Sequence, residues 1–234
     1  MCTVNKKIVT WTIDDKAFIK KIKNSLINDK HEIAGALLFT NVNCKNGICD
    51  KKSNKFKMVE GNGSSVYTPE GAVNFHTHPK HAYAGEDAKY GWPSGEDMAQ
   101  CIRFAKSGTL VHVVFTLEGA YIIKVNKILK EEDTRLLEDL FQETHIFRSK
   151  NQALQLKNFK TASGLSGSTT VKIWLKLANG VTLEKLYKSN GKNNKGNKEP
   201  IFSVTLVPLN SKIKFSANFI SEKCHRKSFG EKSY

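Results

Sequence analysis

The stretch of sequence that decides the fold and its chemistry is Ala72-Val73-Asn74-Phe75-His76-Thr77-His78-Pro79. Its apolar start predicts a short buried strand over residues 72–76, and Pro79 is expected to end that strand because proline cannot donate to a sheet ladder. Side chains alternate along a strand, so His76 and His78 lie on the same face. That arrangement suits a metal ion, although a single His-x-His pair is more often a pair of surface residues.

Two acidic segments flank this stretch in the sequence. Glu32 directly precedes an apolar run over residues 33–42 that predicts a second buried strand, and Ser94-Gly95-Glu96-Asp97 is expected to open a helix. Two imidazoles and one carboxylate can hold zinc and leave a fourth position for water. A second carboxylate outside the ligand set can take a proton from that water. Ser-x-x-Asp is by itself a common helix N-cap pair, and capping is compatible with a catalytic role.

Taken together, these segments resemble the JAMM (MPN+, JAB) metalloprotease family. The family pattern is a Glu beside a Gly-containing apolar strand, then His-Ser/Thr-His-Pro, then Ser-x-x-Asp at the start of a helix. The matching residues in this chain are Glu32 with Gly35, His76-Thr77-His78-Pro79, and Ser94-Gly95-Glu96-Asp97. The resemblance covers residues 1–148 and implies an α/β (α+β) fold of the MPN/cytidine-deaminase-like type, in which a mixed sheet is flanked by helices.

The resemblance also implies a function and a role for each site residue. The implied activity is that of a zinc-dependent isopeptidase or deubiquitinase, a metalloprotease that hydrolyses the (iso)peptide bond of ubiquitin or a ubiquitin-like modifier. The implied ligands of Zn²⁺ are His76, His78 and Asp97. Glu32 would be the general base that activates a zinc-bound water, and Ser94 would hydrogen-bond the developing oxyanion. A JAMM peptidase acting on non-ubiquitin peptides is an alternative.

One segment departs from the family pattern. Fifteen residues separate His78 from Ser94, where family members usually have about seven. The additional length lies in Lys80–Pro93, and a longer loop costs little entropy, so it leaves coordination intact but makes substrate recognition an open question. The Gly91-Trp92-Pro93 end of this loop is similar to that of JAB proteins of large DNA viruses.

Charge is distributed unevenly along the chain, whose net charge is +15. Residues 1–148 hold 21 Lys and Arg against 18 Asp and Glu, whereas residues 149–234 hold 16 against 4. A basic C-terminal third predicts an acidic partner such as nucleic acid, or else a solubilising face. The competing function is therefore a nucleic-acid-associated protein that uses its basic C-terminal unit and keeps the JAMM-like domain as a scaffold.

Periodicity and turn residues predict the other elements. Helices are expected over residues 14–29 and 131–147, and a hairpin over residues 110–125. A Gly/Ser-rich linker over 149–170 is followed by a small basic all-β domain over 171–234, with an Asn179-Gly180 hairpin turn. Its first strand would present Lys172, Trp174 and Lys176 on one face. Such a face either stacks a base or protects a sheet edge with lysines.

The remaining expectations concern location and single residues. The chain shows no secretory signal and no apolar run near the roughly 20 residues of a membrane span, so it is expected in the cytoplasm or nucleus, or in a host cell or virion if viral. Five cysteines without a signal indicate reduced thiols, with a Cys44–Cys49 disulfide only in an oxidising compartment. His112 alternates with apolar neighbours and is expected to be a core or edge histidine rather than a ligand.

Overall fold

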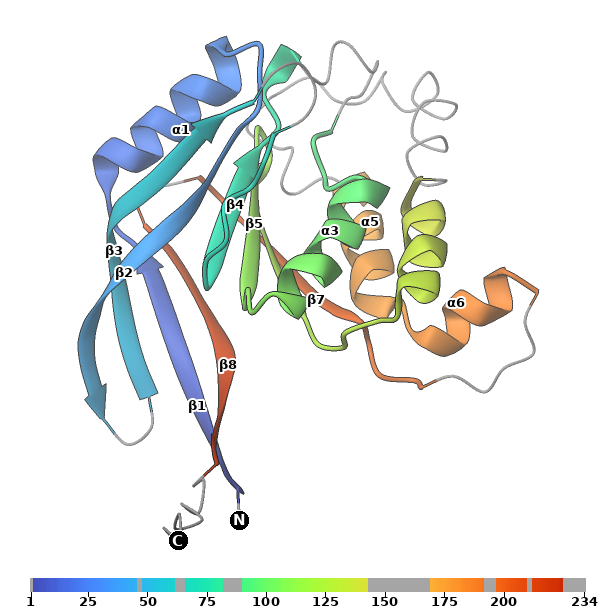
Figure 1. The fold of residues 1–234 in the computed structure, drawn as a ribbon. Helices are drawn as coiled ribbons and strands as arrows, with labels where there is room; N and C mark the ends of the chain where they lie inside the picture. The colour runs from blue at the N-terminus through green and yellow to red at the C-terminus, as the bar shows by residue number, and fades with distance from the viewer. Residues whose placement is uncertain are drawn as a thin grey trace, which may run out of the picture.

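A computed structural model describes residues 2–45, 48–61, 66–81, 90–142, 169–191, 197–209 and 212–224. Its centre is one mixed sheet of eight strands in the order β7-β6-β5-β4-β2-β3-β1-β8 (Figure 1). The strands are β1 (Cys2–Ile13), β2 (Ile33–Lys45), β3 (Ile48–Glu60), β4 (Val73–Thr77), β5 (Val111–Thr116), β6 (Gly119–Val125), β7 (Phe202–Val207) and β8 (Ile213–Cys224). The pairs β1–β3 and β4–β5 are parallel and the other pairs are antiparallel, which confirms the expected mixed sheet.

Helices cover both faces of the sheet (Figure 1). The helix α1 (Lys16–Asn28) packs on one face with Val113 and Phe115 of β5, whereas α3 (Gly95–Lys106) packs on the other face with Val114. This split follows from the alternation of side chains along β5. The face that α3 covers therefore carries the alternate residues of β4 and β5, among them His76 and His112.

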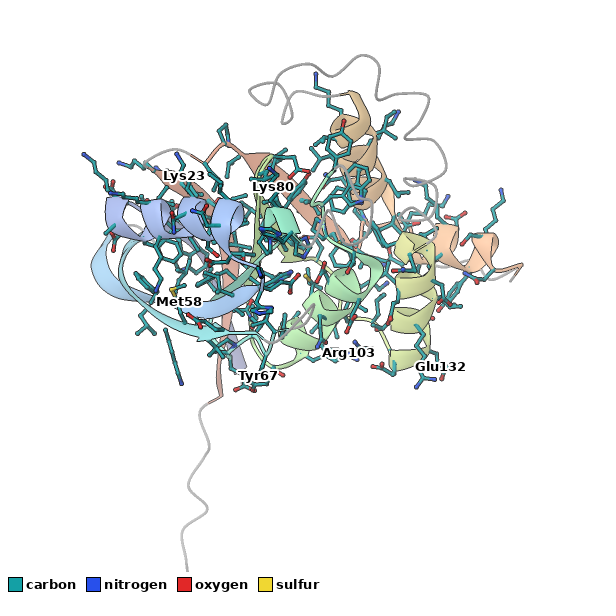
Figure 2. All side chains as sticks on the ribbon, turned by 90° about the horizontal axis from the view of Figure 1, so that it is seen from above. Lys23, Met58, Tyr67, Lys80, Arg103 and Glu132 are labelled. Carbon is teal, nitrogen blue, oxygen red and sulfur yellow. The ribbon has the colours of Figure 1, made fainter. Side chains whose placement is uncertain are left out.

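A further helix over residues 131–142 lies beside α3 on the same face, as Figure 2 shows from above. Arg103 of α3 pairs with Glu131 at 3.1 Å and with Glu138 at 3.8 Å. The two backbones approach so closely that a Cβ on Gly95 would collide with the carbonyl oxygen of Glu138. The predicted helices over 14–29 and from 94, and the β5–β6 hairpin, are confirmed, and residues 143–147 of the third predicted helix lie outside the described part.

The predicted small all-β unit at the C-terminus is wrong in its first half. Residues 171–187 were expected to form two strands, but they fall in α5 (Thr169–Gly180) and α6 (Leu183–Ser189). Val171, Trp174 and Ala178 are buried while Ile173 is 61% exposed. Burial at spacings of three and four is the period of a helix, and the alternation of apolar residues that favoured a strand is incidental.

The second half of that prediction is correct in its strands but wrong in assigning them to a separate unit. The expected strands near residues 201–207 and 212–219 are β7 and β8, but β7 pairs with β6 and β8 pairs with β1, so both extend the main sheet. Asn179 is not in a hairpin turn. Its side-chain amide donates to the carbonyl of Leu175 and bonds both backbone groups of Val204, which ties α5 to β7.

Three other expectations concern the predicted linker, the cysteine pair and a membrane span, and the described residues bear on each only in part. The predicted linker falls outside them except for its last two residues, 169 and 170. Cys44 and Cys49 are register partners in the β2–β3 pair, and their side chains are not among those described. Among the described residues no helix has the length and apolar character that a bilayer crossing needs.

Candidate metal centre

The two candidate histidine ligands lie at the end of β4, in the middle of the sheet. His76 is the register partner of Ala34 on β2 and of Val114 on β5, so strands on both sides hold its backbone. Just beyond the strand, the backbone N–H of His78 donates to the carbonyl of Phe115 at 2.9 Å. Two neighbouring strands therefore fix both imidazoles on the α3 side of the sheet.

The third candidate ligand comes from the first turn of α3. Ser94 is the N-cap, and it forms a capping box with Asp97. The Ser94 hydroxyl accepts from the Asp97 backbone N–H at 3.1 Å and donates to Asp97 Oδ2 at 2.8 Å. The Ser94 backbone N–H donates to the same carboxylate oxygen at 2.6 Å. Capping therefore orients the Asp97 carboxylate, so that the same motif can cap the helix and present a metal ligand.

The donor atoms of these three residues converge on one point. His76 Nε2 lies 2.9 Å from His78 Nε2 and 3.2 Å from Asp97 Oδ1, and His78 Nε2 lies 3.3 Å from Asp97 Oδ2. Donors about 2.0–2.1 Å from a tetrahedral zinc ion lie about 3.3 Å from one another, so the set fits such an ion after a shift of a few tenths of an ångström. His76, His78 and Asp97 can thus hold a metal ion.

Glu32 lies next to this group without belonging to it. Its Oε1 is 3.7 Å from His78 Nε2. Backbone bonds hold the residue on both sides: the Ile33 N–H donates to the hydroxyl of Thr77 at 3.0 Å, and the Gly61 N–H donates to the Glu32 carbonyl at 2.9 Å. The structure brings all five residues of the sequence-derived site together, with Glu32 beside the ligands and Ser94 behind one of them.

The end of the long Lys80–Pro93 segment also contacts the site, whereas residues 82–89 lie outside the described part. His78 Nδ1 is 2.8 Å from the carbonyl oxygen of Gly91, and the Gly91 N–H donates to the buried carboxylate of Glu118. A carbonyl only accepts, so Nδ1 of His78 carries a proton and Nε2 is the nitrogen that faces the metal position. The sequence pattern did not predict that Glu118 holds Gly91.

Aromatic packing ties the C-terminal helix α5 to this segment. Tyr90 and Trp92 stack with centroids 5.1 Å apart, and Trp92 stacks on Trp174 at 6.1 Å. Trp174 is only 3% exposed. It therefore cannot stack a nucleic-acid base, and the predicted Lys172-Trp174-Lys176 surface does not exist in the folded chain.

Behind His76 lies a second histidine. His76 Nδ1 is 2.8 Å from His112 Nε2, and His112 Nδ1 is 2.7 Å from Asn74 Oδ1. His112 is buried, in agreement with its predicted core or edge position. Its contact with a ligand was not predicted, because the only signal for it is the β4–β5 register that places Asn74 opposite His112.

Electrostatics in the metal-free site reflect the close approach of unlike charges. Burial by itself lowers the pKa of His78, but Asp97 and then Glu32 outweigh it and raise this pKa from 6.5 to about 9. Burial alone would raise the pKa of Asp97, yet His76 and His78 hold it well below its usual range. Burial, together with His76, holds the pKa of His112 well below 6.5. The site thus favours an ionised carboxylate facing a cation.

Comparisons with known proteins add one relative. The chain is 26% identical over 135 residues to the uncharacterized protein 3R of Frog virus 3 (isolate Goorha). The match spans 57% of this chain and 30% of that protein, so the chain corresponds to less than a third of its relative's length. No family model matches the chain, and no solved structure matches it.

Proposed function

We propose that this chain is a zinc-dependent hydrolase of the JAMM type that cleaves the isopeptide bond joining ubiquitin or a ubiquitin-like modifier to a lysine. The observation that carries the proposal is the convergence of His76, His78 and Asp97 with one further carboxylate, Glu32, 3.7 Å from a ligand atom. Three ligands with a neighbouring carboxylate are the composition of a hydrolytic rather than a structural zinc site.

Zinc bound there would supply a Lewis acid and lower the pKa of a water molecule at its open position to about 7. Glu32 accepts the proton of the attacking water and delivers it to the leaving lysine amine, since its carboxylate lies beside the metal position and outside the ligand set. The Ile33–Thr77 and Gly61–Glu32 hydrogen bonds fix the backbone at Glu32 and so help to keep its carboxylate near the metal position.

Ser94 has two tasks in this mechanism. Its hydroxyl donates to Asp97 in the structure and keeps that ligand oriented. To stabilise the oxyanion of the scissile carbonyl, the hydroxyl turns from Asp97 toward the substrate while the Ser94 backbone N–H stays on the carboxylate. The backbone half of the capping box is therefore sufficient to hold Asp97 during the reaction.

The ubiquitin-type substrate is supported by the family resemblance alone, and a peptidase for other peptides is the closest alternative. The two features that favoured a nucleic-acid role for the C-terminal part, an exposed aromatic side chain and a separate β unit, are not found in the part of the chain that the structure describes. The aromatic side chain that would stack a base, Trp174, is buried, and β7 and β8 belong to the sheet that carries the site.

The test is cleavage of a panel of ubiquitin dimers and a ubiquitin–fluorophore conjugate by the full chain. Wild type would be compared with Glu32→Gln, with Glu60→Gln as an exposed carboxylate control, and with chelator-treated protein. We expect activity that is abolished by Glu32→Gln and by the chelator and retained in Glu60→Gln. If the protein binds one zinc and cleaves only short peptides, the proposed substrate is wrong and the peptidase alternative holds. If the protein binds no zinc, the whole proposal is overturned.

A further inference from the structure

Three buried side chains form a line that ends at the metal position. Asn74 Oδ1 lies 2.7 Å from His112 Nδ1, and His112 Nε2 lies 2.8 Å from His76 Nδ1. The three residues are between 0 and 5% exposed. The rings of His76 and His112 stack with centroids 4.9 Å apart. The ring nitrogens of His112 therefore have Asn74 and His76 as their hydrogen-bond partners.

The direction of the hydrogen bonds follows from the end of the line. An amide oxygen can only accept, so Nδ1 of His112 must carry a proton and donate to Asn74. A neutral imidazole has one donor and one acceptor nitrogen, which makes Nε2 of His112 an acceptor. His76 must then donate from Nδ1, so that Nε2, which faces Asp97 and His78, is the nitrogen left to bind a metal ion.

We propose that His112 and Asn74 are positioning residues that hold His76 in the tautomer able to bind metal through Nε2. The inference rests on the metal site of the proposed function. In the opposite tautomer the proton of His76 would sit on Nε2 and point at the metal position, so that binding would first require its removal. Partners of this kind typically change metal affinity by about 10- to 100-fold when they are removed.

The two histidine ligands need different partners because of where they lie. His78 is beyond the end of β4 and reaches the carbonyl of Gly91. His76 is within β4, where its backbone neighbours already pair with β2 and β5, so a side chain must supply the acceptor. The parallel register sets Asn74 directly opposite His112, and His112 then lies next to His76 on the same face.

The experiment compares His112→Phe with His112→Gln in the full-length protein. Phenylalanine fills the site but cannot accept a hydrogen bond, whereas the glutamine amide oxygen can accept from His76 Nδ1. Zinc affinity is measured by competition with a chromophoric chelator, and folding is checked by circular dichroism and thermal unfolding. We expect the dissociation constant to rise about 10- to 100-fold in His112→Phe and to stay within about threefold of wild type in His112→Gln.

A second readout does not need a stable variant. Long-range ¹H–¹⁵N correlation spectra of the wild-type histidine rings, without and with zinc, report which nitrogen is protonated. We expect the proton on Nδ1 of both His112 and His76. An Nδ1 of His76 that carries no proton, either without or with zinc, or equal zinc affinity in the Phe and Gln variants, would overturn the inference. A wild type that binds no zinc would instead overturn the proposed function, and the ring spectra would still decide the direction of the hydrogen bonds.

Discussion

Thr77→Val tests whether the site depends on the residue between its two histidines. Thr77 is fully buried, and its Oγ1 accepts the backbone N–H of Ile33 at 3.0 Å. That bond joins Thr77, the last residue of β4, to the residue that follows Glu32. Valine has nearly the same shape as threonine but no acceptor, so the substitution removes this one bond and leaves all three candidate ligands in place.

The magnitude follows from the burial of both partners. Ile33 is 4% exposed, so its N–H would be left unpaired away from water, at a cost of about 1–3 kcal/mol in the free energy of unfolding. Thr77→Ser keeps the acceptor and deletes one methyl group, at a cost of about 1 kcal/mol. Both variants lose stability, but only valine releases the backbone next to Glu32. A displacement of about 1 Å in a catalytic group can lower the rate by about 100-fold.

The assay combines urea unfolding, zinc stoichiometry and the rate of ubiquitin-conjugate cleavage for wild type, Thr77→Val and Thr77→Ser. We expect the valine variant to bind one zinc and to cleave about 10- to 100-fold more slowly, with the serine variant close to wild type. Equal rates for the two folded variants would refute the claim that Thr77 positions Glu32. Loss of zinc from the valine variant alone would show that the bond supports the ligands instead.

Three further predictions concern proton release on zinc binding, the pH dependence of stability, and packing. The pKa of His78 in the metal-free protein is raised to about 9, so zinc that binds below that pH must displace a proton from the imidazole. The apparent dissociation constant for zinc should therefore fall by up to about tenfold for each pH unit between 6.5 and 9. Titration calorimetry in buffers of different ionisation enthalpy measures this proton release, and a dissociation constant that does not change with pH would contradict the prediction. The interactions of protonated His78 with Asp97 and Glu32 stabilise the metal-free fold fully below pH 6.5, and this contribution is lost as the pH rises through 9. Urea unfolding at several pH values measures the change. Trp174→Ala removes the contacts with Trp92 and Tyr121 and should cost about 3–5 kcal/mol. Trp174→Ala should also weaken zinc binding, whereas Trp174→Phe should retain most of the stability and most of the zinc affinity. Full zinc affinity in the alanine variant would show that α5 does not support the Gly91–His78 contact.

Local signals were enough to predict much of the N-terminal part. The helix α1 has a capping aspartate, Asp15, and apolar residues at helical spacing, and both features act within a few residues of chain. The same holds for Ser94 at the start of α3 and for the β5–β6 hairpin. Each of these elements is stabilised by contacts close in sequence, which composition and periodicity describe well.

Two errors have a common cause. The strand β1 was not predicted, and α5 was expected to be a strand, because the pattern around each is compatible with more than one structure. Residues 171–178 alternate in hydropathy and also place Val171, Trp174 and Ala178 at helical spacing. The helix is selected by packing on the aromatic surface of Tyr90 and Trp92, since only the helical face brings Val171, Trp174 and Ala178 together there; Trp92 lies 82 residues before Trp174 in the chain.

The sequence by itself determined which residues the candidate site contains, since His76, His78 and Asp97 as ligands and Glu32 beside them are recognisable by type and spacing. Only the tertiary structure decided what stands around them: His112 and Asn74 behind His76, Gly91 and Glu118 against His78, and Trp174 against the segment that bears Gly91. These contacts join segments 13 to 82 residues apart. They depend on strand register and on the packing of α5, which are set by the whole sheet and by no local pattern.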